Sequence, residues 1–127
     1  MEKEKILTAR EEEFYRYLKK ELFLSGIRVR FKQSLWDICS QNPVPMPYGN
    51  EAGLLKQIDI DFVLYRKDRL IAGIEILDEA SELDENLGEK TLIDFNFKRI
   101  NARCFMIMGT DDLKKAAKFI KEKISSS

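Results

Sequence analysis

The sequence predicts an α/β domain in which a mixed four-stranded sheet is flanked by helices. Residues 57–77 form two β-rich runs around a charged turn, which is typical of a hairpin. Apolar residues recur at helical spacing in residues 7–23, 90–102 and 112–124, and each of these segments predicts an amphipathic helix. A wholly apolar run at residues 104–108 predicts a short central strand. The order helix, three strands, helix, strand, helix then implies a mixed sheet with helices on its faces.

The composition narrows the classes of site that the chain can form. Its 127 residues fit one domain, residues 1–127, that can bury a core without disulfides or metals. Lysine and arginine together number 22, as do aspartate and glutamate, so no overall charge attracts nucleic acid. The absence of histidine excludes histidine general bases, histidine zinc ligands and Ser-His or Cys-His nucleophiles. Any catalysis therefore falls to carboxylates and lysines.

Two further features of the sequence concern the cellular compartment. Cys39 and Cys104 each lie in an apolar segment, which favours buried thiols in a reducing compartment over a disulfide. The sequence shows neither a signal peptide nor a long apolar run, so we expect a cytoplasmic protein without a membrane partner. No pattern in the sequence indicates an oligomeric state.

The first helix, expected at residues 7–23, carries a candidate functional carboxylate. Thr8 is followed three residues later by Glu11, which is the spacing of a capping box. Glu11 also lies on the apolar side of the helix, the side that holds Phe14 and Leu18. Two interpretations stay open: Glu11 only caps the helix, or it also points towards a polar site beside the core.

The segments between the first helix and the hairpin leave further alternatives open. Residues 27–32 alternate as a strand with one basic face, which either contacts phosphates or is simply solvated. Residues 35–39 continue as a short strand or a helical turn. Residues 41–53 predict a loop, either mobile or functional, because alternating prolines disfavour both helix and inner-strand pairing. The basic face of the strand is formed by Arg28, Arg30 and Lys32.

The hairpin carries two carboxylates in apolar surroundings. Alternation along its first strand places Ile60 and Phe62 on one face and Asp61 on the other. Glu75 is a lone carboxylate within the apolar second strand. An unpaired charge in a strand core is costly. A bound divalent cation would compensate for it, as would a paired lysine or arginine at an exposed sheet edge.

The length of the hairpin turn decides whether these carboxylates meet. A three-residue turn at residues 67–69 would place Arg66 opposite Leu70. Counting five residues along each strand then places Asp61 opposite Glu75, on the same face of the sheet. A two-residue turn would send the two carboxylates to opposite faces. We expect the three-residue turn.

The second half of the chain carries an acidic stretch and a stripe of mixed charge. Residues 78–89 are strongly acidic and predict a solvated loop. In the helix expected at residues 90–102, the side chains of Lys90, Asp94 and Lys98 recur at four-residue intervals. This spacing is typical of stabilising intrahelical ion pairs.

The element order and several short motifs resemble the PD-(D/E)XK nuclease superfamily, which has a restriction-endonuclease-like αβββαβ(α) core. Asp61 opens Asp-Phe-Val-Leu, as the first acid does in that superfamily, and Glu75 ends the next strand, as the second acid does. More narrowly, the chain resembles a small uncharacterised branch near the very-short-patch repair endonucleases. The segments that resemble this branch are Leu7-Thr8-Ala9-Arg10-Glu11, Asp61-Phe62-Val63 and Ile74-Glu75-Ile76-Leu77-Asp78-Glu79-Ala80-Ser81, with Asp94 and Lys98 in the next helix.

The resemblance implies metal-dependent hydrolysis of phosphodiesters on DNA, with Mg²⁺ or Mn²⁺ as the cofactor. Asp61, Glu75 and the carbonyl oxygen of Ile76 would be the metal ligands. Glu11 would hold an outer water or a second ion, and Lys98 would supply a catalytic ammonium group.

Two departures from the family pattern bear on this activity. The lysine of the motif normally lies two residues after the second acid, where this chain has Leu77. Lys98, or else Lys90, would then stand in for it from the next helix. The histidine of the narrower branch is replaced by Glu82. Two function classes are therefore open: a metal-dependent nuclease domain, and a catalytically degenerate nuclease-fold module that binds nucleic acid or a protein partner.

Overall fold

The computed structural model describes residues 7–42, 44–77 and 87–125, which form an α/β fold. The helices are α1 (Ala9–Glu21), α2 (Leu35–Ser40), α3 (Gly49–Gln57), α4 (Leu87–Arg99) and α5 (Leu113–Ser125), and the strands are β1 (Ile27–Ser34), β2 (Asp59–Arg66), β3 (Arg69–Ile76) and β4 (Arg103–Ile107). The sheet has the order β1-β2-β3-β4, antiparallel from β1 to β3 and parallel between β3 and β4. The predicted α/β class and mixed sheet are confirmed, with element ends that differ by a few residues.

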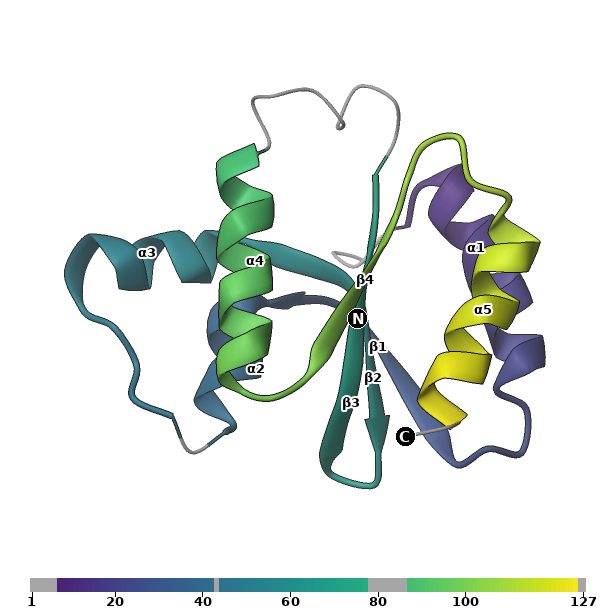
Figure 1. Ribbon diagram of the computed structural model, residues 1–127, viewed down its shortest axis with the longest axis horizontal. Helices are drawn as coiled ribbons and strands as arrows, with labels where there is room; N and C mark the ends of the chain where they lie inside the picture. Colours follow the sequence, from purple (N-terminus) through teal and green to yellow (C-terminus); the bar gives the residue numbers. More distant parts are fainter. Residues whose placement is uncertain (1–6, 43, 78–86, 126–127) are drawn as a thin grey trace.

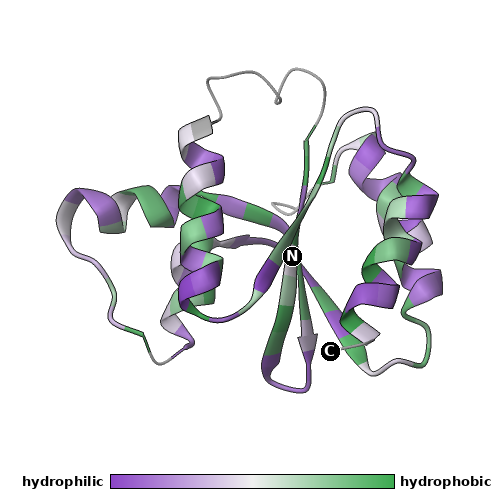
Figure 2. Ribbon diagram, in the orientation of Figure 1, coloured by the Kyte–Doolittle hydropathy of each residue, from purple (hydrophilic) through white to green (hydrophobic). Residues whose placement is uncertain are grey.

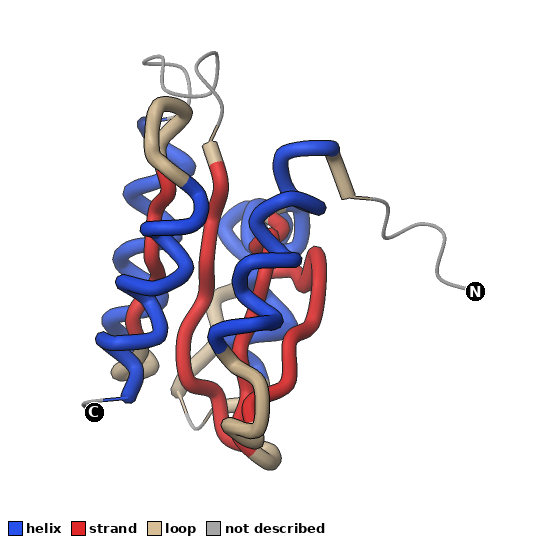
Figure 3. Tube along the Cα trace, turned by 90° about the vertical axis from the view of Figure 1, so that its right-hand side faces the viewer, coloured by secondary structure: helices blue, strands red, loops and turns tan. Residues whose placement is uncertain are grey.

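Helices cover both faces of the sheet (Figure 1). α1 and α5 lie on one face, where they pack side by side, as Figure 3 also shows. α2, α3 and α4 lie on the other face. The parallel connection from β3 to β4 runs through α4, because parallel neighbours need a crossover. The middle strands β2 and β3 are therefore covered from both sides.

The hydrophobic core accordingly has two parts, one on each face of the sheet. Figure 2 shows that the helices are apolar along one stripe and polar along another. The cluster beneath α1 and α5 includes Phe14, Leu18, Phe62, Ile74 and Ile120. The cluster beneath α2, α3 and α4 includes Leu35, Ile38, Leu55, Ile60 and Phe97. Any ionisable group on the middle strands must therefore be accommodated between two apolar layers.

Helix ends follow signals in the local sequence. Thr8 Oγ1 accepts a hydrogen bond from the Glu11 N–H at 3.1 Å, and Glu11 Oε1 accepts one from the Thr8 N–H at 3.0 Å. The predicted capping box is thus confirmed. α4 ends in a Schellman motif, in which Asn101 has a φ of 60° and the Ala102 N–H donates to the Phe97 carbonyl at 2.9 Å.

The segment between β1 and β2 is more helical than predicted. Residues 35–39, left open between strand and helical turn, belong to helix α2, whose N-cap is Ser34. The loop expected at residues 41–53 is shorter, because α3 occupies its last residues. Ala52 and Leu55 are buried about one helical turn apart. The sequence did not indicate a helix at these two buried residues, because the prolines and glycines around them are typical of a loop.

The turn of the β2–β3 hairpin also differs from the predicted one. Arg66 lies opposite Arg69, so the turn contains two residues, and the expected three-residue turn is wrong. Lys67, the first turn residue, has a φ of 60°, in the left-handed region that tight hairpin turns use. By itself, this turn would send Asp61 and Glu75 to opposite faces.

A β-bulge corrects the register before it reaches the carboxylates. The pairing shifts by one residue between Leu64 and Tyr65, after which Phe62 lies opposite Ile74. The regular pairing ends at this pair, one residue short of the carboxylates, but Asp61 and Glu75 line one cavity. The two carboxylates therefore lie together as predicted, although the turn is not the predicted one.

The regular alternation predicted for β2 breaks at Asp61. Ile60 packs in the cluster beneath α2, α3 and α4, whereas Phe62 packs in the cluster beneath α1 and α5. The expectation that these two residues share a face is therefore wrong. The neighbouring strand is irregular at the same level, since Lys32 has a φ of 52°. This irregularity leaves Asp61 between the two layers of the core.

Some predictions fall outside the described residues. Glu82 and residues 78–81 of the second acidic motif do so, and so does most of the acidic stretch at residues 78–89. Among the helices of the described part of the chain, none is both long and apolar enough to cross a membrane.

Gly73 allows a test of how tightly β3 packs against α4. A Cβ atom added there would lie 2.6 Å from Cζ of Phe97 and 3.2 Å from Cγ2 of Ile60. We expect Gly73→Ala to lower the free energy of unfolding by about 1–3 kcal/mol in chemical denaturation, because overpacking forces the core apart. Gly53→Ala is the control, since nothing lies within 4 Å of the added atom. It lies within α3 and should be neutral or stabilising. Equal effects of the two substitutions would contradict this packing.

Candidate carboxylate–lysine site

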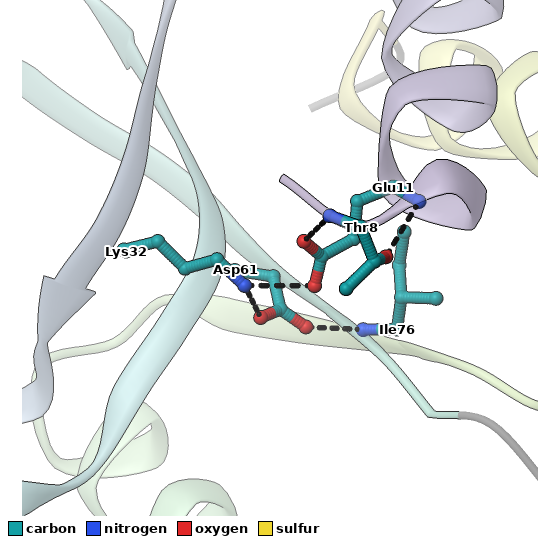
Figure 4. Close-up of polar contacts among 5 residues, drawn as sticks. All are labelled: Thr8, Glu11, Lys32, Asp61 and Ile76. Atoms are coloured by element: carbon teal, nitrogen blue, oxygen red, sulfur yellow. Dashed lines mark hydrogen bonds and ion pairs between the residues drawn. The ribbon is translucent and has the colours of Figure 1, made fainter. Parts of the chain in front are cut away.

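A cluster of ionisable side chains lies where β2 begins, with Asp61 at its centre (Figure 4). Asp61 is 8% exposed, and both of its carboxylate oxygens accept hydrogen bonds. Oδ1 accepts from Lys32 Nζ at 2.8 Å, and Oδ2 accepts from the backbone N–H of Ile76 at 2.8 Å. One side chain thereby connects β1, β2 and β3.

Lys32 extends this connection to α1. Its Nζ also donates to Glu11 Oε2 at 2.7 Å, while the other oxygen of Glu11 accepts the Thr8 N–H. The second interpretation of Glu11 is therefore correct: one oxygen caps the helix and the other joins a polar site. The side chains of Lys32, Glu11 and Asp61 are 22%, 8% and 12% exposed. The ammonium group is thus a largely buried bridge between two carboxylates.

The sheet opens beside Asp61, whose side chain completes the hydrogen bonding there. The pairing of β2 with β3 ends at Phe62 and Ile74. Beyond this pair, the N–H of Ile76 donates to the Asp61 carboxylate instead of to a backbone carbonyl of β2. A buried N–H group without a partner would cost about 1–3 kcal/mol. The Asp61 carboxylate therefore satisfies a backbone donor of β3 that lies beyond the last β2–β3 pair.

Lys32 has an unusual backbone conformation for a lysine in a strand. Its φ of 52° lies in the left-handed region, which costs energy for any residue with a Cβ atom. It lies opposite Asp61, although β1 and β2 pair regularly on either side of it. The same residue forms the ion pairs to Glu11 and Asp61.

Glu75 lies beside Asp61 on the side of the sheet that α4 covers. The two residues line a cavity of about 150 Å³, together with Glu89, Lys90 and Ile93 of α4. Glu75 is 9% exposed. The cavity thus brings two carboxyl groups of adjacent strands into one small polar space.

The surroundings of Glu75 favour its neutral form. Burial raises the pKa of Glu75 to about 9, and both the charge of Asp61 and a hydrogen bond to it act in the same direction. Burial also raises the pKa of Asp61, while its hydrogen bonds to Lys32 and Ile76 favour the charged form. Because Asp61 has the cationic partner, the charged form is favoured at Asp61 and the neutral form at Glu75.

Lys32 keeps its charge in this environment. Burial tends to lower the pKa of Lys32, but hydrogen bonds to Asp61 and Glu11 outweigh that effect and raise its pKa above the ordinary value. Two carboxylates thus share one ammonium group at the centre of the site.

Most of the candidate site residues that were predicted from the sequence lie together in the structure. Glu11, Asp61, Glu75 and Ile76 all belong to this cluster. Lys98 does not contact it: its side chain is 76% exposed and pairs with Asp94 at 3.3 Å. Since Lys90 lines the cavity and Lys98 lies eight residues further along α4, the two are about 12 Å apart along the helix.

Lys32 is the residue of this cluster that sequence reasoning missed. Its alternation with Arg28 and Arg30 indicated only a basic strand face. The signal that could have identified it is the antiparallel register of β1 and β2, which sets Lys32 opposite Asp61. That register depends on the long connection through α2 and α3, which no local pattern defines.

Other groups that could carry chemistry are less suited to it. Among the described residues, no group of three or more carboxylates, thiols or imidazoles is arranged to hold a metal ion. Cys39 and Cys104 are free thiols, as expected, and burial raises the pKa of each. Neither is therefore poised as a thiolate nucleophile.

No protein-family model matches the chain, and neither does any curated protein or solved structure. What the site does must therefore be argued from its own residues.

Removing the ammonium group of Lys32 should leave two buried carboxylates without a counter-charge. We expect Lys32→Met to lower the free energy of unfolding by about 3 kcal/mol at neutral pH, and by less in acid as the carboxylates become protonated. Lys98→Met is the matched control, because its ion pair with Asp94 is exposed and should contribute about 0.5 kcal/mol or less. Urea denaturation at two pH values measures both. Equal losses in the two variants would show that Lys32 does not act as a buried bridge.

Glu75 should make the protein less stable as the pH rises. Its pKa of about 9 in the folded state lies above the unfolded value, so the folded state holds a proton that the unfolded state has released. Stability should fall by up to about 1.4 kcal/mol per pH unit between about pH 6 and about pH 8. The chain has no histidine to obscure this window. Glu75→Gln should abolish the slope, whereas Glu51→Gln, at an exposed carboxylate of α3, should retain it. A wild-type protein whose stability is flat over this window would refute the assignment.

Proposed function

We propose that this chain is a PD-(D/E)XK-like nuclease domain that hydrolyses phosphodiesters of DNA with a bound Mg²⁺ or Mn²⁺ ion. One observation carries the proposal: Glu11, Lys32, Asp61 and Glu75 converge from four separate elements on one largely buried polar site. Burying four ionisable groups is costly, and groups with raised pKa values such as those of Asp61 and Glu75 cluster at functional sites.

The order of the elements supports the same proposal. α1, β1, β2, β3, α4, β4 and α5 follow the αβββαβ(α) order of that superfamily, with α2 and α3 inserted between β1 and β2. The carboxylates lie on the two middle strands of that order, as the resemblance requires.

The oxygen donors of the site suit a hard divalent cation. Asp61 and Glu75 line one cavity, and each oxygen of Asp61 keeps a second lone pair beside the hydrogen bond it accepts. The N–H of Ile76 faces Asp61, and in an extended strand the carbonyl of the same residue points to the same edge. When bound, such an ion polarises the phosphodiester and stabilises charge on the leaving oxygen.

The side chains of the site divide the remaining tasks. Lys32 would supply the ammonium group that stabilises negative charge on the phosphate, a task that Leu77 cannot perform. Glu11 is a positioning residue, because it holds Lys32 Nζ from the far side. Glu75 must release its proton to become a metal ligand. We therefore assign to Lys32 the part that the resemblance gives to a lysine of the next helix.

A second candidate function is a catalytically degenerate module of the same fold that binds nucleic acid or a protein partner. Two observations favour it: the Lys32 ammonium group already neutralises Asp61 and Glu11, and Leu77 is buried in the position of the family lysine. The absence of net charge on the whole chain also agrees with this function.

Metal binding decides between these candidates. We expect Mg²⁺ or Mn²⁺ to stabilise the wild-type protein against thermal unfolding, by about 2.7 kcal/mol at a hundredfold excess over the dissociation constant. Asp61→Asn should abolish this stabilisation and also abolish cleavage of DNA. Asp59→Asn is the control, because it makes the same change two residues away at an exposed position of β2. A wild-type protein that millimolar metal does not stabilise would leave only the degenerate module.

A further inference from the structure

The end of the sheet away from the carboxylates holds a separate cavity of about 740 Å³. It lies between the β2–β3 turn, the first residue of β4 and the last turn of α5. Its cationic lining residues, here called the basic cavity residues, are Arg66, Lys67, Arg69 and Arg103. No carboxylate lines it.

Within the described part of the chain, the basic cavity residues have no carboxylate partner. All four are exposed, and none forms an ion pair with a carboxylate of the described residues. Arg103 instead lies over the ring of Phe105, with its guanidinium carbon 5.5 Å from the ring centroid. Because positive and negative residues balance over the whole chain, four cations around one cavity are a local excess.

The chemistry of this lining fits phosphate groups. Three of the four cations are arginines, whose planar forks bind phosphate oxygens in pairs. Asn101 adds an amide, and Leu70, Ala102 and Ile124 offer apolar surface for the part of a ligand between its phosphates. A volume of this size is typical of ligand sites.

We propose that the basic cavity binds the phosphate backbone of a nucleic-acid strand. Arg66 lies five residues along β2 from Asp61, which corresponds to about 17 Å. About five phosphates of one duplex strand extend that far along the helix axis. The choice of nucleic acid rests on the proposed function, whereas the cavity and its charge do not.

Fluorescence anisotropy with a short labelled oligonucleotide, single-stranded or duplex, tests this proposal in EDTA over a range of salt concentrations. Arg66→Gln/Arg69→Gln should weaken binding about tenfold or more and reduce the slope of log affinity against log salt by about 1.5. Lys114→Gln/Lys118→Gln is the matched control, because it removes the same charge from the exposed side of α5. It should change affinity by less than about twofold, as expected for charges distant from the ligand.

Three results would overturn the proposal. The first is that the wild-type protein does not bind the oligonucleotide. The second is that the two double variants lose equal affinity for it. The third is that tripolyphosphate binds the cavity more tightly than the oligonucleotide at equal phosphate concentration. The last would assign the cavity to a small oligophosphate.

The two proposals can fail separately. Asp61→Asn protein that binds the oligonucleotide normally, together with a wild type that does not cleave it, would remove catalysis and keep the basic cavity. A wild type that cleaves DNA while Arg66→Gln/Arg69→Gln binds and cleaves it unchanged would remove the basic cavity and keep the catalytic site.

Discussion

A single carboxylate, that of Asp61, ends the β2–β3 ladder by accepting the Ile76 N–H and also holds the ammonium group of Lys32. Lys32 in turn holds Glu11, whose second oxygen caps the first turn of α1. The start of α1, the irregularity in β1 and the opening of the sheet are therefore set by one chain of hydrogen bonds. Each link involves a charged group and is partly buried, so the links strengthen one another.

Burying these charged groups in the core costs free energy of desolvation. A buried ion pair recovers little net stability, and apolar residues of similar volume are often as stable or more so. Phe14 and Phe62, whose ring centroids are 5.4 Å apart, show that the same layer also packs well without charge. The presence of the charged cluster is thus better explained by a chemical function, or by the selection of one fold among alternatives, than by a contribution to the stability of the fold. Protonation of Glu75 lowers the cost, since only one of the two neighbouring carboxyl groups is charged.

The parts of this structure that could be predicted from sequence are those with a local signal. Helical spacing identified α1, α4 and α5, and the Thr8–Glu11 spacing identified the cap of α1. What could not be predicted depends on long-range pairing. Lys32 belongs to the site because of the β1–β2 register, and Asp61 lies between the layers because the pleat breaks beside it. The chemical role of the site has no local signal beyond the family resemblance.

The hairpin limits which insertions and deletions its sequence can accept during evolution. Asp61 and Glu75 are fourteen residues apart, and this even separation can be closed by a three-residue turn or by a two-residue turn with a bulge. During evolution, the extra residue can therefore lie either in the turn or in a strand bulge without changing the relative position of the two acids. Insertion or deletion of one residue turns one carboxylate away unless the turn or the bulge changes with it. The match between turn length and bulge, and not the identity of the turn residues, is what selection on this site would preserve.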